Sequence, residues 1–596
     1  MTNTPRVYLC QFSVDIKKTV AFYPYSAGCV WAYAESKGTV TREQLGGIFF
    51  LKSDFDNMLD RFVSPDIVGF SNYLWNGNYN LELSKRIKDK FPNCIIVFGG
   101  PETPDTSVEF LNTNKHIDIL VHQEGEVAFN SILSRMPVDT ISNITYRKGD
   151  DIVTNPSSRI QKLIDVPSPY LIGLFDNLDA EGRVLNAILE TDRGCPYKCT
   201  FCDWGSLTFN KVKQFGLEKI FAEIEWAGIH KTEFIHLADA NFGIFKERAL
   251  LVAQQLVATK KKYGYPKKFD TSWAKNSNDD VLEVANTLNK ANLTARFDLS
   301  VQSLNTVVQE NIERSNMGIN KFDELVYKAR DRGLLATVEL ILLLPGETFE
   351  SWKVGLIKLL DHKNIVIEVN PAQLLKNSEL SSPATRERFG IKSCLGDLGA
   401  WSSLFIKEDA EYITETTSMS YEDLQRSWQW TWCARLGHVL GITNIILEEI
   451  RKTKQLSSET FYTKWYEYIT TSSGLLNEKF IQWCDLYLTS NQFINYTYEF
   501  GYMEELGNTR RSELLVELET FLSSNFSYLD LDFKDLVEYF NVAYFNSNIS
   551  YPIYYKSVII DHSGMGIFDK FNMFIGMTRR QGGWRCSITN KETIND

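Results

Sequence analysis

The sequence contains no run of eighteen or more apolar residues, so no segment is predicted to cross a bilayer as a helix. Its first residues, MTNTPRVYLCQFSV, have no long apolar stretch behind a basic region; they do not resemble a secretory signal and predict a cytoplasmic protein. Basic residues are not in excess: the formal net charge is −12 at pH 7, which argues against nucleic acid as a partner. The ten cysteines are scattered apart from one trio, unlike the disulfide framework of a small secreted protein.

The hydrophobic pattern divides the 596 residues into three predicted regions, because one core rarely serves a chain of this length. In residues 1–165, apolar runs such as DIVGFSNYL and CIIVFGG alternate with helix-like segments such as NLELSKRIKDKF. This order is typical of a parallel sheet with crossover helices. We therefore predict an α/β protein that begins with a doubly wound, Rossmann-like domain, followed by a hairpin over ISNITYRKGDDIVTNP.

In such sheets a ligand binds outside the carboxyl ends of the strands. We expect this site on three loops, SNYLWN, GGPETP and QEGE, where glycines allow close backbone approach and polar side chains supply contacts. The candidate residues are Ser71, Asn72, Gly99, Gly100, Glu102, Glu124, Gly125 and Glu126. The alternative interpretation is that the glycines only shape turns.

In residues 166–394 a second alternating series begins, with the strand candidates NAILET, EFIHLAD, FDTSWA, RFDLSVQS, TVELILLLPG and VIEVNP. Helix-like segments lie between them. Six β/α units in about two hundred residues predict a partial (β/α)6 barrel rather than a full eight-fold one.

Residues 395–596 lose this alternation and become rich in aromatic residues, which predicts a mainly helical accessory or substrate domain. Trp428, Trp430 and Trp432 have two interpretations: they line a substrate cavity, or they pack in a core. We favour the core, because aromatic residues on helices usually pack inside a protein.

Cys195, Cys199 and Cys202 form a CxxxCxxC motif at the end of the first predicted barrel strand, with no fourth cysteine beside them. A structural zinc ion would normally have four protein ligands. A four-iron cluster held by three thiolates instead leaves one iron open to a small molecule. His230 and His236 lie close enough in sequence to keep a zinc site as the alternative.

The three cysteines, with Phe201 directly before the last, resemble the signature of the radical S-adenosylmethionine (radical SAM) enzymes. The fuller string TDRGCPYKCTFCDWGS is similar to that of the subgroup with an N-terminal cobalamin-binding domain. Three later stretches, LADANFG, SVQSLNTVVQENIERSN and ELILLLPGET, resemble barrel strands of the same subgroup. The resemblance spans roughly residues 1–390.

The resemblance implies that the cysteines ligate a 4Fe–4S cluster, that the open iron chelates the amino and carboxylate groups of SAM, and that Phe201 lies near the adenine. Further SAM contacts are implied at Asp239, Asn241, Gln302, Ser303, Arg314 and Glu339. Arg314 would pair with the SAM carboxylate through its planar fork. Cobalamin would occupy the three N-terminal loops. For each polar residue the alternative is an ordinary helix cap or surface group.

Two departures from the subgroup's pattern stand out. Leu343 occupies a position where the pattern often has glycine, so the local backbone is expected to differ. The DxHxxG motif, which provides a histidine lower ligand to cobalamin in some proteins, is absent, and the sequence around His122 does not match it. Cobalamin is therefore expected to bind without a histidine ligand.

The implied activity is a cobalamin-dependent radical SAM methyltransferase acting on an unactivated carbon or a phosphinate-type phosphorus. A 5′-deoxyadenosyl radical would remove a substrate hydrogen, and methylcobalamin would deliver the methyl group. The reaction needs an external electron donor such as flavodoxin or ferredoxin. The sequence does not identify the substrate. Two alternatives remain: radical rearrangement or cyclisation without methyl transfer, and a non-catalytic cobalamin-binding iron–sulfur protein.

Overall fold

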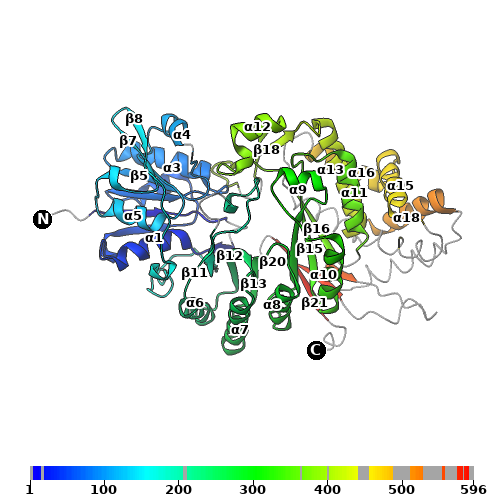
Figure 1. The fold of residues 1–596 in the computed structure, drawn as a ribbon, viewed down its shortest axis with the longest axis horizontal. Coiled ribbons are helices and arrows are strands. Elements are labelled where there is room, and N and C mark those ends of the chain that lie inside the picture. The colour runs from blue at the N-terminus through cyan, green and yellow to red at the C-terminus, as the bar shows by residue number, and fades with distance from the viewer. Residues whose placement is uncertain are drawn as a thin grey trace.

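The computed structural model describes residues 5–14, 19–105, 107–205, 211–362, 365–398, 402–439, 447, 456–487, 506, 510–527, 553–556, 574–580 and 583–589. Along the long axis of Figure 1, an N-terminal α/β sheet lies at one end and a second α/β unit in the centre. A group of helices occupies the other end. The α/β class with a mainly helical C-terminal region, predicted from the sequence, is confirmed.

The N-terminal unit is a seven-stranded sheet of order β3-β1-β4-β5-β6-β7-β8. Its parallel strands are β1 (Val7–Cys10), β3 (Leu45–Phe49), β4 (Ile67–Ser71), β5 (Ile95–Gly99) and β6 (Ile119–Val121). The predicted hairpin adds antiparallel β7 (Ile144–Lys148) and β8 (Asp151–Thr154) at one edge.

Helices cover both faces of this sheet, because its strands are apolar on both sides. In β1, Val7 and Leu9 pack into one core layer while Tyr8 and Cys10 pack into another. The crossover helices are α1 (Tyr25–Ser36), α2 (Phe55–Asp60), α3 (Gly77–Lys90), α4 (Ser107–Thr113) and α5 (Gly125–Leu133). The predicted doubly wound, Rossmann-like architecture is thereby confirmed.

The central unit contains the six predicted barrel strands in chain order: β9 (Val184–Leu189), β12 (Phe234–Phe242), β13 (Lys268–Trp273), β14 (Arg296–Gln302), β15 (Leu335–Leu342) and β16 (Ile365–Pro371). Helices follow most of these strands: α6 (Leu217–Ile229), α7 (Lys246–Tyr263), α8 (Asp279–Lys290), α9 (Thr306–Asn311), α10 (Ile319–Asp331) and α11 (Phe349–Leu360). The ladders are parallel, and within the described residues none joins β13 to β14. The partial barrel therefore has a seam between these two strands.

A short strand from the N-terminal segment extends the barrel sheet. β2 (Val20–Phe22) pairs in parallel with the start of β9, Val20 opposite Val184. The sequence does not predict this strand, because three residues are too few to show a period of two.

The segment after the barrel returns to the N-terminal sheet. It contains α12 (Pro383–Phe389) and the hairpin β17 (Lys392–Asp397) and β18 (Asp409–Glu415). The carboxylate of Glu408 accepts hydrogen bonds from Lys52 Nζ at 2.9 Å and from the backbone N–H of Asn78 at 2.8 Å. Because the Lys52 and Glu408 side chains are only 4% and 1% exposed, a buried ion pair at the start of α3 ties the two units together.

The described C-terminal helices are α13 (Tyr421–Val439), α15 (Ser458–Thr471), α16 (Leu475–Tyr487) and α18 (Arg511–Phe526). Trp430 and Trp432 are buried, and Trp432 stacks on Trp483 with ring centroids 5.7 Å apart. The core interpretation of these tryptophans is confirmed, with Trp428 packed at the margin of the same core. An antiparallel sheet of β19 (Ile553–Lys556), β20 (Phe574–Arg580) and β21 (Gly583–Thr589) also follows, which the sequence does not predict.

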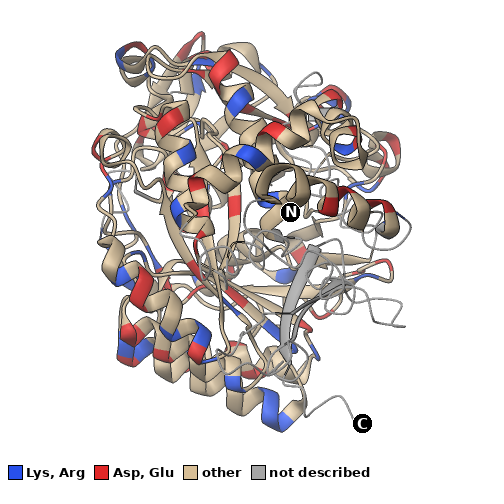
Figure 2. Ribbon diagram, turned by 90° about the vertical axis from the view of Figure 1, so that its right-hand side faces the viewer, with Lys and Arg blue, Asp and Glu red and all other residues tan. Residues whose placement is uncertain are grey.

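Charges of both signs are interspersed along the outer helices of the described chain in the view of Figure 2, without a continuous basic stripe on that side. Among the described residues, no helix is both long and apolar enough to cross a membrane.

Replacing Lys52 by methionine is expected to lower the free energy of unfolding by about 3–5 kcal/mol, because it leaves the Glu408 carboxylate buried without its cation. Urea unfolding of the apo-protein measures this change. The control is Arg330→Met, which breaks an exposed pair with Asp331 and should cost about 0.5 kcal/mol or less. Equal losses in the two variants would contradict the role assigned to the buried pair.

Candidate active site

The three cysteines lie on a loop that follows β9 and crosses the carboxyl end of the barrel. The loop begins with β10 (Asp192–Arg193), which pairs with β11 (Lys213–Gln214). Cys195 and Cys199 are buried, and Cys202 is partly exposed. The backbone of Thr200 donates to Ile312 O at 3.1 Å and accepts from Leu380 N at 2.8 Å, so the loop is held from two sides.

Nitrogen donors surround two of the sulfur atoms. Asn241 Nδ2 donates to Cys195 Sγ at 3.1 Å. Lys275 Nζ and Arg314 donate to Cys199 Sγ at 3.5 and 3.7 Å. Burial raises the pKa of the Cys202 thiol, while the positive charge of Lys275 acts in the opposite direction.

The donor set fits an iron–sulfur cluster better than a single metal ion. Zinc requires its ligands within about 2.0–2.3 Å of one point. Among the described residues, no group of three or more His, Cys, Asp or Glu side chains converges on such a point. In a 4Fe–4S cluster each cysteine binds a different iron, so the three sulfur atoms surround the cluster and do not meet at a single metal ion.

The two histidines of the zinc alternative have other contacts. The ring of His230 stacks on Trp226, with centroids 4.0 Å apart, and its Nδ1 lies 2.9 Å from Trp226 O. His236 lies on β12, with Nδ1 3.6 Å from the carboxylate of Asp270.

Asp239, expected at SAM, holds the turn into the cysteine loop. Its carboxylate accepts from the backbone N–H groups of Thr191 at 2.7 Å and Asp192 at 3.2 Å, and from the Thr191 hydroxyl. Burial raises the pKa values of both Asp239 and Asp192 above the usual range. The structure thus gives Asp239 a partner set within the protein, two residues along β12 from Asn241.

Gln302 carries two marks of a functional position at the end of β14. Its backbone is left-handed, with φ of +67°, beside an irregularity in the ladder to β15. Its side chain is buried, and its amide oxygen Oε1 has no hydrogen-bond partner within the described residues. Left-handed backbone costs about 1–2 kcal/mol in a residue other than glycine, and buried polar atoms are rarely unsatisfied.

The other SAM candidates are differently engaged. Ser303 donates its hydroxyl to Glu347 at 2.7 Å, and Glu339 accepts from the Ser300 hydroxyl at 2.7 Å. Arg314 is buried, donates to Asn316 at 2.8 Å and also contacts the backbone oxygen of Ser300. Phe201 is partly buried and packs against the main core. Of these residues, Arg314 and Phe201 lie directly at the cysteine loop.

Leu343, the departure from glycine, keeps a backbone that glycine would favour. Its φ is +75°, in the left-handed region, while its side chain is 1% exposed. Burying a leucine gains about 1.5–3 kcal/mol, which offsets a strain of about 1–2 kcal/mol. Burial of the side chain therefore offsets the strain of its left-handed backbone.

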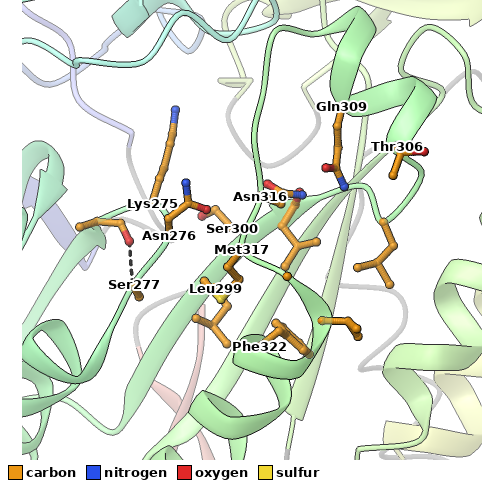
Figure 3. Close-up of a pocket in the computed structure, with 15 residues that line it drawn as sticks. Lys275, Asn276, Ser277, Leu299, Ser300, Thr306, Gln309, Asn316, Met317 and Phe322 are labelled. Carbon is orange, nitrogen blue, oxygen red and sulfur yellow. Dashed lines mark hydrogen bonds between the residues drawn. The ribbon is translucent and has the colours of Figure 1, made fainter.

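A pocket of about 270 Å³ lies at the seam between β13 and β14, and its lining includes Lys275, whose Nζ contacts Cys199 Sγ. Lys275, Asn276 and Ser300 lie along one side of it, and Leu299 and Phe322 along another (Figure 3). Its walls come from the carboxyl ends of both strands, from α9 and from the start of α10.

In the N-terminal sheet, the loops after β4 and β5 lie against each other. The buried Asn72 donates to Thr103 Oγ1 at 3.3 Å and accepts from Asn80 at 2.6 Å. Gly100 has φ of +96°, and a Cβ there would lie 2.5 Å from Asn72 O. Gly100 therefore permits a backbone approach that any other residue would block.

The other candidate residues of the three loops differ in the contacts that they make. Ser71 Oγ lies 3.1 Å from Ser26 Oγ, and Glu102 lies 3.3 Å from Lys376 Nζ. A Cβ at Gly99 would make only ordinary contact with Val121, and Gly125 begins α5.

The two glutamates around Gly125 are buried and paired. Glu124 accepts from the backbone N–H of Ile160 at 2.7 Å, and Glu126 lies 2.8 Å from Arg193. Arg193, on β10, also pairs with Glu190 at 2.9 Å. Glu126 therefore joins the N-terminal sheet to the cysteine loop.

One short segment touches both candidate cofactor loops. The side chain of Asn377 accepts from Asp105 N at 2.8 Å and donates to Thr103 O at 2.9 Å, in the loop after β5. Three residues later, Leu380 N donates to Thr200 O in the cysteine loop. Burial, with the charges of Asp105 and Glu102, raises the pKa of Asp203 to about 6, which also reflects the closeness of the two loops.

Sequence reasoning missed Arg193, Lys275 and Asn377. Lys275 follows a predicted strand directly, so its place at the carboxyl end of the barrel was a usable signal. The other two act through contacts between distant segments, for which a single sequence carries no pattern.

A family model described as the Radical SAM superfamily matches residues 189–354. The chain is 32% identical over 464 residues to the cobalamin-dependent radical SAM methyltransferase TokK of Streptomyces tokunonensis, covering 75% of this chain and 68% of TokK. It is 31% identical, with the same coverage, to the 2-(S-pantetheinyl)-carbapenam-3-carboxylate methyltransferase of Streptantibioticus cattleyicolor. The cobalamin-dependent radical enzyme OxsB has a similar fold, with a TM-score of 0.56, 14% identity and coverage of 89% and 85%. The chain belongs to the cobalamin-dependent radical SAM methyltransferases.

The polar barrel interior generates a pH dependence that can be measured. Burial raises the pKa of Asp298, 3.8 Å from Arg296, to about 7, so the folded protein binds an extra proton between about pH 4 and pH 7. Stability contributed by this proton is present at low pH and is lost as pH rises. The free energy of unfolding of Asp298→Asn, relative to that of the wild type, should therefore increase by on the order of 1–3 kcal/mol as the pH is raised from about 5 to about 8. Thermal unfolding at each pH measures this difference. Asp331→Asn, at an exposed site, is the control; a difference that does not change with pH would contradict the assignment.

Proposed function

We propose that this enzyme transfers a methyl group to an unactivated carbon of a small carboxylate related to the substrate for which the Streptantibioticus cattleyicolor relative is named. The observation that carries this proposal is the extent of the similarity. The 464 aligned residues extend well beyond the 189–354 segment shared with radical SAM enzymes in general. Regions outside the radical SAM segment, from which substrate contacts are expected, are therefore also related.

We further propose that Cys195, Cys199 and Cys202 hold the 4Fe–4S cluster. Gln302 and Arg314 are then proposed to contact the SAM bound at the open iron of this cluster. The buried, unpartnered amide oxygen of Gln302 and the guanidinium beside Cys199 support these roles. When bound, the cluster and SAM supply the radical that removes a substrate hydrogen, and cobalamin supplies the methyl group. The protein's own part is to orient these groups and to exclude water from them.

Cobalamin is assigned to the carboxyl edge of the seven-stranded sheet, on the loops from Ser71, Gly99 and Gln123. The close approach at Gly100 and the position of this edge against the cysteine loop support the assignment. In this proposal residues 1–165 bind cobalamin, residues 166–394 hold the cluster and SAM, and residues 395–596 complete the substrate site.

The electron that starts the reaction is proposed to come from a separate flavodoxin or ferredoxin. A cytoplasmic location is proposed as well, because none of the nine described cysteines forms a disulfide, as is usual in a reducing compartment.

Anaerobic protein reconstituted with iron, sulfide and hydroxocobalamin should cleave SAM in the presence of dithionite. With 2-(S-pantetheinyl)-carbapenam-3-carboxylate and SAM deuterated in its methyl group, mass spectrometry should detect a deuterated methyl group in the product. Cys199→Ala should lose both activities, because one iron of the cluster loses its thiolate. Cys94→Ala, at a buried cysteine of the N-terminal sheet, is the matched control and should keep them. SAM cleavage without methylated product would leave the enzyme class intact and refute the substrate class.

Gly100→Ala should weaken the binding of hydroxocobalamin at least tenfold, measured by the absorbance of the bound corrinoid. The added Cβ would collide with the backbone of Asn72 and displace the loop after β4. The matched control is Gly149→Ala, which has a similar left-handed φ of +65° but open space around the Cβ. Equal affinities in the two variants would show that cobalamin does not depend on this loop.

A further inference from the structure

The side chain of Lys275 points to the cysteine loop, and the proposed function gives this lysine no role. It follows β13, and its Nζ lies 3.5 Å from Cys199 Sγ. The side chain passes over the ring of Tyr197, 5.3 Å from the centroid, while the Tyr197 hydroxyl donates to the backbone oxygen of Lys275 at 3.4 Å. In Figure 3 Lys275 extends away from the apolar side chains of the seam pocket.

Asn241 holds Lys275 and reaches a second sulfur. Its Oδ1 accepts the backbone N–H of Lys275 at 3.2 Å, and its Nδ2 donates to Cys195 Sγ at 3.1 Å. Asn241 is 2% exposed, so its amide is fixed by these contacts. Two of the three cysteines are thus contacted by one connected pair of side chains from β12 and the end of β13.

Arg314 does not duplicate this arrangement. Its guanidinium is shared between Asn316 at 2.8 Å and the backbone oxygen of Ser300, and its contact with Cys199 Sγ, at 3.7 Å, is longer. Among the described residues, Lys275 therefore has the shortest contact between a cationic side chain and a sulfur atom of the cysteine loop.

We infer that Lys275, held in place by Asn241, raises the reduction potential of the cluster and so makes it reducible by an ordinary one-electron donor. The inference rests on the proposed cluster at the three cysteines. One electron passes from an external flavodoxin or ferredoxin to the cluster; no proton is transferred and no bond is made or broken. Reduction adds one negative charge, which a cation and N–H donors at the sulfurs stabilise in a partly dehydrated site.

The test is the midpoint potential of the reconstituted cluster, measured without SAM by redox titration and followed by the EPR signal of the reduced state. Lys275→Met removes the charge and the donors but keeps the aliphatic stem. At the wild-type midpoint, the ratio of reduced to oxidised cluster should fall about tenfold in this variant, a shift to more negative potential. Lys275→Gln keeps N–H donors, so its ratio of reduced to oxidised cluster should lie between those of Lys275→Met and the wild type. Lys275→Arg restores the charge, so its ratio should be close to that of the wild type.

Lys246→Met controls for the loss of one positive charge, because Lys246 pairs with Asp280 and Glu283 on an outer helix. It should leave the potential unchanged. Iron content is measured in every sample. If Lys275→Met and Lys275→Gln lose the cluster, the test passes to Lys275→Arg: a loaded cluster with a midpoint potential close to that of the wild type supports the inference, and a clearly more negative potential overturns it.

Equal potentials in loaded wild type and Lys275→Met would also overturn the inference, while leaving the proposed function intact. A wild-type protein that takes up no four-iron cluster would instead refute the proposed function itself. The two failures are therefore distinguishable in one set of samples.

Discussion

The relation between the two cofactor regions depends on one buried guanidinium. Arg193 is 2.8 Å from Glu126, on α5 of the N-terminal unit, and 2.9 Å from Glu190, and it lies over the ring of Phe215. Breaking such a buried pair costs about 3–5 kcal/mol, because an uncompensated charge stays inside the protein. Since Arg193 is two residues before Cys195, this interaction fixes the start of the cysteine loop against the sheet proposed to bind cobalamin.

The remaining contacts around the site act on the same loop from other directions. Asp239 clamps its first turn through Thr191, and the segment with Asn377 and Leu380 touches both it and the loop after β5. Radical transfer of a methyl group needs two cofactors to face one substrate carbon, so contacts that hold one support against the other serve the reaction. Between β13 and β14, by contrast, no ladder joins the strands within the described residues, and a pocket lined in part by Lys275 lies at this seam.

The sequence predicts the elements well and the contacts poorly. The six barrel strands are recognisable because each is a short apolar run bounded by turn or helix signals, whereas β2, with three residues, gives no such pattern. The three cysteines are recognisable from local spacing. The SAM contact expected at Asp239 stays a prediction, while its hydrogen bond to Thr191 cannot be read from the sequence. The contact between Lys275 and Cys199 cannot be read from it either, because the two residues lie far apart along the chain. Leu343 departs from the pattern in residue type, and its backbone has the left-handed conformation that glycine favours.

The most direct test of this account is a crystal structure of the reconstituted enzyme with anomalous diffraction recorded at the iron and cobalt absorption edges. The account predicts iron density bounded by Cys195, Cys199 and Cys202, and cobalt density at the carboxyl edge of the seven-stranded sheet, facing the cysteine loop. Iron away from these cysteines, or cobalt on another face of the sheet, would contradict it.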